Sequence, residues 1–180
     1  MQGLWSFRFG PEARLALDDQ VSSSPTRSLR ATPNGPNGSV LGRDVSTPAL
    51  TAIEVTFSLR TDSAEEDFSQ VLQVELEPEK GFAIVEIRGG VLALVEQVTL
   101  EAGVFYDTRP AAALPIGGFE RFRLRVDIGN GTFSLASSSG TTERTFIHGH
   151  SRVSAVLAGA SFAGSRTAPH WLDDVVITKL

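Results

Sequence analysis

Two adjacent aspartates, Asp173 and Asp174, interrupt an otherwise apolar segment near the end of the sequence. Neighbouring residues on a strand point to opposite faces, so at least one of the two carboxylates must approach the protein interior. A buried carboxylate is costly unless it has a partner. Calcium, which binds carboxylate and carbonyl oxygens, is one such partner. The alternative is a metal-free carboxylate that accepts backbone amides or pairs with an arginine. We favour this alternative because the rest of a ligand shell is not visible in the sequence.

A row of three glutamates, Glu75, Glu77 and Glu79, occupies every second residue of one segment. On a strand, this spacing places all three carboxylates on one face. Glycoside hydrolysis needs two carboxyl groups that flank the scissile bond, so such a row is one way to build a glycosidase. Pro78 disturbs the end of the strand, and a solvated outer face explains the row more simply. We therefore rank hydrolysis below a non-catalytic role and predict no catalytic residue.

Aromatic side chains offer flat apolar faces on which sugar rings stack. Tyr106 is the first choice, because we expect Tyr106-Asp107-Thr108-Arg109 to be a loop that adds polar groups beside the ring. Asp107 and Arg109 therefore join Tyr106 in the predicted ligand site. Phe105 is a further candidate for stacking, whereas Trp5 and Trp171 fit core packing better.

Three arginines, Arg121, Arg123 and Arg125, face one way on a predicted strand. They would bind an anion such as an acidic glycan, and Arg121 and Arg123 are included in the predicted ligand site. The simpler interpretation is a solvated face that the Glu75–Glu79 row balances from a neighbouring strand.

The histidines offer one further pattern, His148-Gly149-His150, whose spacing would chelate a transition metal with His170 as a further ligand. Gly149 indicates a turn, and no carboxylate ligand is obvious nearby in the sequence. We therefore interpret the segment as a surface loop.

Short strands must position all of these groups. Alternation of apolar and polar residues is clearest at 53–60, 72–77 and 121–128. Gly89-Gly90 and Gly129-Asn130-Gly131 predict tight hairpins. No window of eleven residues carries a helical period. Roughly a dozen strands at this spacing predict an all-β sandwich, and the lack of a linker or repeat predicts a single domain over residues 1–180.

The composition excludes several classes of function. The net charge of −5 argues against nucleic acid as a partner. The chain contains no cysteine, which removes disulfides, thiol catalysis and cysteine-based zinc sites. No apolar run approaches the ~18 residues of a membrane span. No secretory signal is visible at the start of the sequence.

The order of three features resembles one family. These are the turn and strand at Ser24–Ala31, the aromatic-led strand and hairpin from Gly118 to Leu135, and the closing strand Trp171–Ile177. Together they resemble the concanavalin A-like lectin/glucanase superfamily, in particular its laminin-G-like bacterial members, although Phe119 stands where many members have tryptophan. The resemblance implies a jelly roll of two antiparallel sheets. It also implies a structural calcium between a closing aspartate and an N-terminal segment, so that Asp18 and Asp19 join Asp173 and Asp174 as predicted ligands. No other cofactor is expected.

The function expected from this resemblance is a non-catalytic recognition module that binds glycan or cell-surface polysaccharide, with an extracellular or cell-surface location. The alternative is a structural or adhesion domain whose partner is another protein or a second copy, because long edge strands pair readily unless they are blunted. A glycoside hydrolase or lyase that uses the glutamate row is the third hypothesis.

Overall fold

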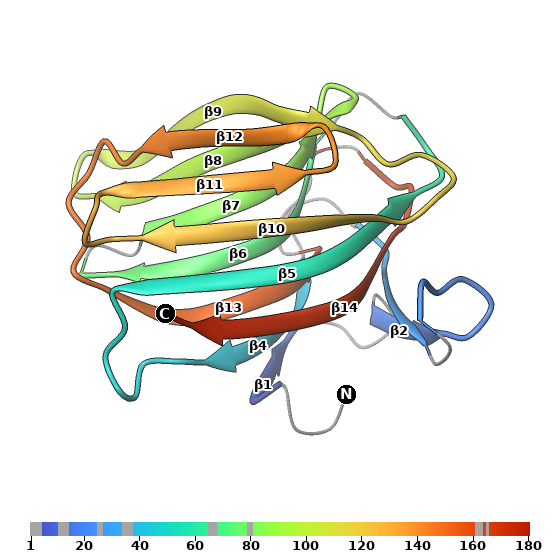
Figure 1. Cartoon of the computed structure of the whole chain (residues 1–180), viewed down its shortest axis with the longest axis horizontal. Coiled ribbons are helices and arrows are strands. Elements are labelled where there is room, and N and C mark those ends of the chain that lie inside the picture. Colours follow the sequence, from blue (N-terminus) through green and yellow to red (C-terminus); the bar gives the residue numbers. More distant parts are fainter. Residues whose placement is uncertain are drawn as a thin grey trace.

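A computed structural model describes residues 5–10, 15–24, 27–33, 38–64, 68–78, 81–160, 164 and 166–180, with only the backbone of Phe7–Phe9. These residues form β-strands and contain no helix, so this part of the chain offers no helix that would cross a membrane. The strands build two stacked antiparallel sheets (Figure 1).

The sheet at the back of Figure 1, which we call sheet I, has the order β1-β4-β13-β6-β7-β8-β9. Its strands are β1 (Phe7–Phe9), β4 (Ser39–Asp44), β13 (Arg152–Ala160), β6 (Ser69–Glu77), β7 (Gly81–Arg88), β8 (Val91–Leu100) and β9 (Gly103–Ala113).

The sheet at the front, sheet II, has the order β12-β11-β10-β5-β14-β3-β2. Its strands are β12 (Gly140–Thr145), β11 (Thr132–Ser137), β10 (Glu120–Asp127), β5 (Ala52–Thr61), β14 (His170–Lys179), β3 (Ser28–Ala31) and β2 (Leu15–Asp18). The predicted closing strand is therefore a central strand of this sheet, between β5 and β3.

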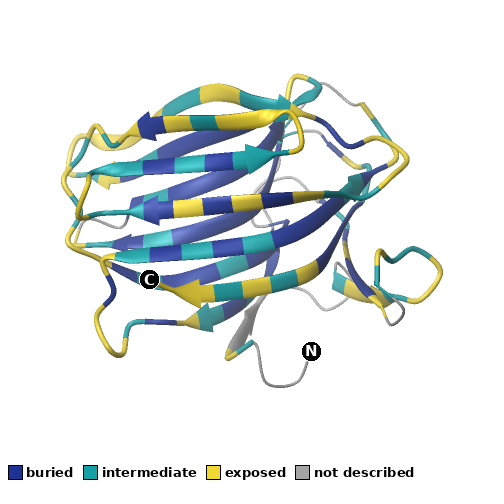
Figure 2. Ribbon diagram, viewed as in Figure 1, coloured by how far each residue is buried: buried dark blue, intermediate teal, exposed yellow. Residues whose placement is uncertain are grey.

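A single hydrophobic core lies between the two sheets. Sheet II contributes Phe57 and Phe122, whose rings stack with centroids 5.7 Å apart, and sheet I contributes residues such as Val74 and Val85. The alternation seen in the sequence is visible on β10 as successive buried and exposed bands (Figure 2). The all-β, jelly-roll sandwich predicted from the sequence is confirmed.

The predicted hairpins are also present. Arg88 pairs with Val91, so Gly89 and Gly90 form a two-residue turn, and both have positive φ angles of 58° and 77°. A type I′ turn requires positive φ at both central residues, and glycine adopts positive φ without steric cost.

The prediction of a loop at Tyr106–Arg109 was wrong, because these residues lie in the middle of β9, the edge strand of sheet I. Pro110 lies in the same strand. Proline lacks an amide hydrogen, and an edge strand tolerates that because one side of its backbone has no neighbouring strand.

Candidate functional site

The face of sheet I that points away from the core is organised in rows by the pairing of its strands. Residues paired across antiparallel strands share a face, and the first such row runs over four strands. It consists of Glu75 on β6, Phe82 on β7, Gln97 on β8 and Tyr106 on β9. The next row consists of Gln73, Ile84, Val95 and Thr108.

The second row is shielded from solvent, although it faces away from sheet II, the other sheet that the described residues form. Ile84 and Val95 have no exposed surface, and neither belongs to the core between the sheets. Glutamine side chains account for part of this burial. Gln73 Nε2 donates to Gln70 Oε1 at 2.5 Å, and Gln70 Nε2 lies 3.5 Å from Gln97 Oε1. This amide chain joins β6 to β8 and therefore crosses β7, the strand that lies between them.

A carboxylate lies beneath the same face. Glu86 on β7 is 1% exposed, and its pair is Arg88, two residues further along the strand. Burial raises the pKa of the Glu86 carboxyl, and the charge of Arg88 and a hydrogen bond from Gln70 only partly oppose this effect. The face therefore combines amides with an acid that is held closer to its neutral form.

The first row is open at its edge. Tyr106 is 54% exposed, whereas Gln97 and Phe82 are partly buried. Strands are spaced about 4.8 Å apart, so the two aromatic residues lie roughly 10 Å from each other with Gln97 between them. This arrangement provides two apolar rings and an amide that both donates and accepts hydrogen bonds. Sugars present the complementary surface, because their C–H groups are apolar and their hydroxyls are polar.

Asp107 and Arg109, predicted to act with Tyr106, point to the opposite side of β9. They pair with Glu96 and Leu94, on the side of β8 that faces the core. Asp107 holds the buried guanidinium of Arg144, which also donates to the backbone carbonyls of Leu94 and Asp107 at 3.0 and 2.8 Å. Asp107 thus fixes Arg144 across the open edge between the two sheets. Arg109 lines a hollow of about 370 Å³ at that edge.

Arg121 and Arg123 lie on the outward face of sheet II, so the structure does not bring the five predicted ligand residues together. The suggestion that the Glu75–Glu79 row balances these arginines was wrong, because β6 belongs to the other sheet. Arg123 instead lies 3.7 Å from Glu54 on β5, and Arg125 pairs with Asp127 at 3.1 Å.

The glutamates proposed for hydrolysis are divided between different roles. Glu75 belongs to the outward row of sheet I, and Glu77 forms an ion pair with Arg152 of β13. Glu79 lies outside the described residues.

Asp173 lies on β14 and is 5% exposed. Its Oδ2 accepts the backbone amides of Ser23 and Ser24 at 2.8 and 3.0 Å, and its Oδ1 accepts the amide of Asp174. Burial opposes ionisation of Asp173, but these amides more than compensate and hold its pKa below the usual value. Asp174 has a φ of 50° at a bulge in β14, and it accepts the hydroxyl of Ser23.

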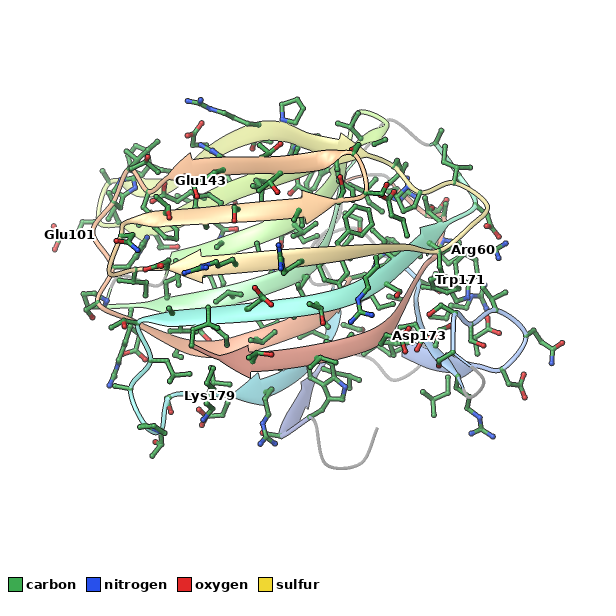
Figure 3. All side chains as sticks on the ribbon, in the orientation of Figure 1. Arg60, Glu101, Glu143, Trp171, Asp173 and Lys179 are labelled. Carbon is green, nitrogen blue, oxygen red and sulfur yellow. The ribbon has the colours of Figure 1, made fainter. Side chains whose placement is uncertain are left out.

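Asp18 takes part in the same contact between the N-terminal segment and β14. Its Oδ2 accepts the indole N–H of Trp171 at 2.8 Å, a hydrogen bond that lowers the pKa of Asp18. Trp171 and Asp173 lie side by side at the β2 end of sheet II (Figure 3). Asp19 accepts the side-chain amide of Gln20. Within the described residues no three acidic, histidine or cysteine side chains are arranged to hold a metal ion, and calcium at these four aspartates stays a prediction.

Sequence reasoning missed Glu96, which holds the His148–His150 loop in place through hydrogen bonds. Glu96 is 2% exposed and accepts the backbone amides of Ile147 and His148 at 2.7 and 3.0 Å. Its Oε1 lies 3.3 Å from His148 Nδ1 and 3.5 Å from His150 Nε2. Burial raises the pKa of Glu96, but the His150 ring and the amides outweigh it and the pKa is lowered. The available clue was a charged residue inside the apolar run 91–98.

The three histidines do not form one site. The segment at His148 and His150 lies in a loop, as predicted, with Ile147 and Gly149 exposed, but the side chain of His150 is fully buried. His170 is fully buried on β14, where its Nε2 bonds to the carbonyl of Gly159 on β13. It thereby links sheet II to sheet I.

Solved structures with the same fold come from proteins of several kinds. A cellulose-induced protein, Cip1, is similar over 100% of this chain and 93% of its own, with a TM-score of 0.71 and 16% identity. The globular domain of T. cruzi calreticulin is similar over 96% of this chain and 80% of its own (TM-score 0.61, 8% identity). An alginate lyase from Alteromonas sp. 272 is similar over 93% and 95% (TM-score 0.58, 11% identity).

No protein-family model matches the chain, and no curated protein matches its sequence. At these identities the structural similarities establish the jelly-roll sandwich fold and nothing further.

Proposed function

We propose that this chain is a glycan-binding module of the concanavalin A-like superfamily, without catalytic activity, and that it acts outside the cell or at its surface. The ligand lies on the outward face of sheet I. The observation that carries the proposal is the row in which Phe82, Gln97 and Tyr106 stand side by side on neighbouring strands.

The chemistry of this row fits a chain of sugar rings. Tyr106 would stack on one ring at the open edge, and Phe82 on a second ring two strands further in. Gln97 would exchange hydrogen bonds with hydroxyl groups between them, while the amide chain keeps its side chain in place. Because the row is carried by three paired strands, little conformational entropy is lost when the ligand binds.

The test is binding to a glycan microarray, followed by calorimetry with the soluble polysaccharides that give a signal. Tyr106→Ala should weaken binding about tenfold or more, since an aromatic hot spot contributes more than about 1.4 kcal/mol. Phe105→Ala is the matched control, because Phe105 is the next residue on β9, is 47% exposed and points to the other side of the strand. Its affinity should stay within about twofold of the wild type.

Two results would count against the proposal. One is a folded protein that binds nothing on a broad array. The other is equal loss of affinity in the Tyr106→Ala and Phe105→Ala variants, which would place the contact elsewhere on β9.

Self-association through β9 is a second candidate function. Val104, Phe105 and Tyr106 are each about half exposed on this edge strand, and Ile147 beside them is 64% exposed. An apolar edge with unpaired backbone groups is a template for another strand. Light scattering across a range of concentrations tests it: a dimer that Val104→Lys converts to a monomer supports pairing, and a monomer at every concentration opposes it.

A further inference from the structure

The outward face of sheet II differs in chemistry from the row just described. Its strands β5, β10, β11 and β12 carry none of the large exposed apolar side chains found elsewhere among the described residues. Three arginines stand instead on one face of β10, at every second residue, and successive ones are roughly 6.8 Å apart. Arg123 and Arg125 are 57% and 51% exposed.

Strand pairing divides this face into rows of unequal charge. Arg125 lies in a row with Glu54, Ser134 and Glu143, so two carboxylates accompany that guanidinium. Figure 3 places Glu143 on β12, at the far side of this face from Trp171. The row of Arg125 is therefore compensated within the protein.

The row of Arg123 contains no carboxylate, and the row of Arg121 contains one, Asp173 on β14 two strands away, which already accepts the backbone amides of Ser23 and Ser24. Arg121 pairs with Ser58, and Arg123 lies between Thr56 and Ala136. Arg121 has no ion-pair partner among the described residues, and the 3.7 Å between Arg123 and Glu54 is too long for a hydrogen bond. Two guanidinium groups therefore stand next to each other with little of their hydrogen-bonding capacity used.

A hollow of about 540 Å³ lies at these two arginines. Short side chains, Thr56, Ala136, Ser137 and Ser138, form part of its lining. Two acids also line it. Glu120 is occupied, because its Oε1 accepts the amide and the hydroxyl of Ser138 at 3.1 and 2.6 Å, and Glu54 lies 3.7 Å from Arg123. A second hollow of about 530 Å³ shares Glu54, Arg123 and Ala136 with the first and extends along β11. Arg125, Asp127 and Glu143 also line it, and Asp127 is occupied by Arg125 and Asn130, so the positive end of the groove lies at Arg121 and Arg123. The two form one groove across the face.

We infer that this groove is a second ligand site, separate from the row at Tyr106, and that it takes an acidic polysaccharide. A carboxylate or sulfate group binds the guanidinium forks of Arg121 and Arg123, which offer paired N–H donors in a plane. Ring hydroxyls bind the serine and threonine side chains along the groove. The absence of large exposed apolar groups on these four strands argues for a sugar chain over a protein, because protein interfaces are anchored by aromatic and aliphatic side chains.

The experiment measures binding of the full chain to three soluble polymers by affinity electrophoresis and calorimetry. These are polygalacturonate, which carries carboxylates, dextran sulfate, which carries sulfates, and neutral dextran. We expect binding to at least one anionic polymer and none to dextran, and the stronger of the two identifies the anionic group. Dextran binding as strong as that of the anionic polymers, or no binding to either anionic polymer, would overturn the inference.

The variant Arg121→Gln/Arg123→Gln should weaken anionic binding about tenfold or more, because it removes the charge-assisted hydrogen bonds to the anionic group. Arg27→Gln/Arg109→Gln is the matched control, since it removes the same charge from exposed arginines elsewhere. The control should bind within about twofold of the wild type. Equal losses in both would show a general charge effect and refute a site.

The variant Arg121→Lys/Arg123→Lys keeps the charge but removes the planar guanidinium groups. It tests the site even if the glutamine variant fails to fold. Its affinity for the anionic polymer should fall about threefold or more. An affinity equal to that of the wild type would contradict recognition by the guanidinium groups. Tyr106→Ala should leave anionic binding unchanged, and the arginine variants should leave binding at the Tyr106 row unchanged. Either site can therefore fail while the other stands.

Discussion

The two outward faces of this sandwich are built by the same alternation of strand residues, yet one is closed and the other open. On sheet I, Ile84 and Val95 point away from the core and are nevertheless fully buried, as is Glu86. On sheet II, the equivalent positions of β10 are arginines that remain about half exposed. Burial on an outward face therefore depends on what the neighbouring strands supply.

The closed face has a second layer of contacts, whereas the described residues around β10 on the open face have none. The amide chain that begins at Gln73 and ends at Gln97 crosses β7, so the outward side of that strand behaves as part of the interior (Figure 2). The side chains beside Arg123 on sheet II, Thr56 and Ala136, are too short to cover a neighbouring strand. Equivalent substitutions on the two faces should therefore have unequal effects.

The largest difference is expected for truncation of an outward residue. Ile84→Ala should lower the free energy of unfolding by about 3–4 kcal/mol, the cost of a cavity at a fully buried site. Thr56→Ala on sheet II should change it by less than about 0.5 kcal/mol. Urea unfolding of both variants measures the two values. A small effect at Ile84 would mean that the amide chain does not close the face in solution.

His170, whose Nε2 bonds to the carbonyl of Gly159 between the two sheets, gives a prediction about the pH dependence of stability. Burial lowers the pKa of His170 from 6.5 to about 4, so the folded protein holds this ring neutral. The unfolded chain takes up a proton below pH 6.5 and the folded chain does not, so stability declines as the pH falls from 6.5 towards 4. The loss attributable to His170 should reach about 3 kcal/mol.

The measurement is urea unfolding at several pH values in this window. His170→Gln removes the titrating group and keeps a side-chain donor. Between pH 6.5 and 4 its free energy of unfolding should therefore fall by about 3 kcal/mol less than that of the wild type. Parallel curves for the two proteins would show that His170 is not held neutral by the fold.

Much of the fold could be predicted from the sequence because alternation and turn residues are local. The strands at 53–60, 72–77 and 121–128 correspond to β5, β6 and β10. The closed face also has a local sign in the sequence: the run Val91-Leu92-Ala93-Leu94-Val95 is apolar at every position, a pattern typical of strands buried on both faces.

Partners across the sheets could not be predicted, because they depend on strand order. Arg123 faces Glu54 and not Glu75, since β10 pairs with β5. Glu96 meets His148 from a strand 52 residues earlier in the chain. Tyr106 was predicted to bind a ligand from a loop, and it lies exposed on β9; its neighbours Gln97 and Phe82 follow only from the register of β7, β8 and β9.

One outward position on sheet II is closed like those of sheet I, and it provides the last test. Asp173 pairs with Ser58 on the outward face, and the Ser23–Ser24 segment covers it. Asp173→Asn keeps the shape of the side chain but removes its charge. The two serine amides then either donate to a neutral oxygen or face an NH2 group, which cannot accept a hydrogen bond. The free energy of unfolding should fall by about 2 kcal/mol at pH 7, less than for Ile84→Ala because no cavity forms.

The pH dependence of this effect separates charge from packing. The folded protein lowers the pKa of Asp173, so the ionised carboxylate adds stability above the ordinary pKa of 3.8 and this contribution is lost as the pH falls below that value. Wild type and Asp173→Asn should therefore converge in stability on acidification. A difference that persists unchanged at low pH would mean that Asp173 closes the outward face by its shape, as Ile84 does, and not by its charge.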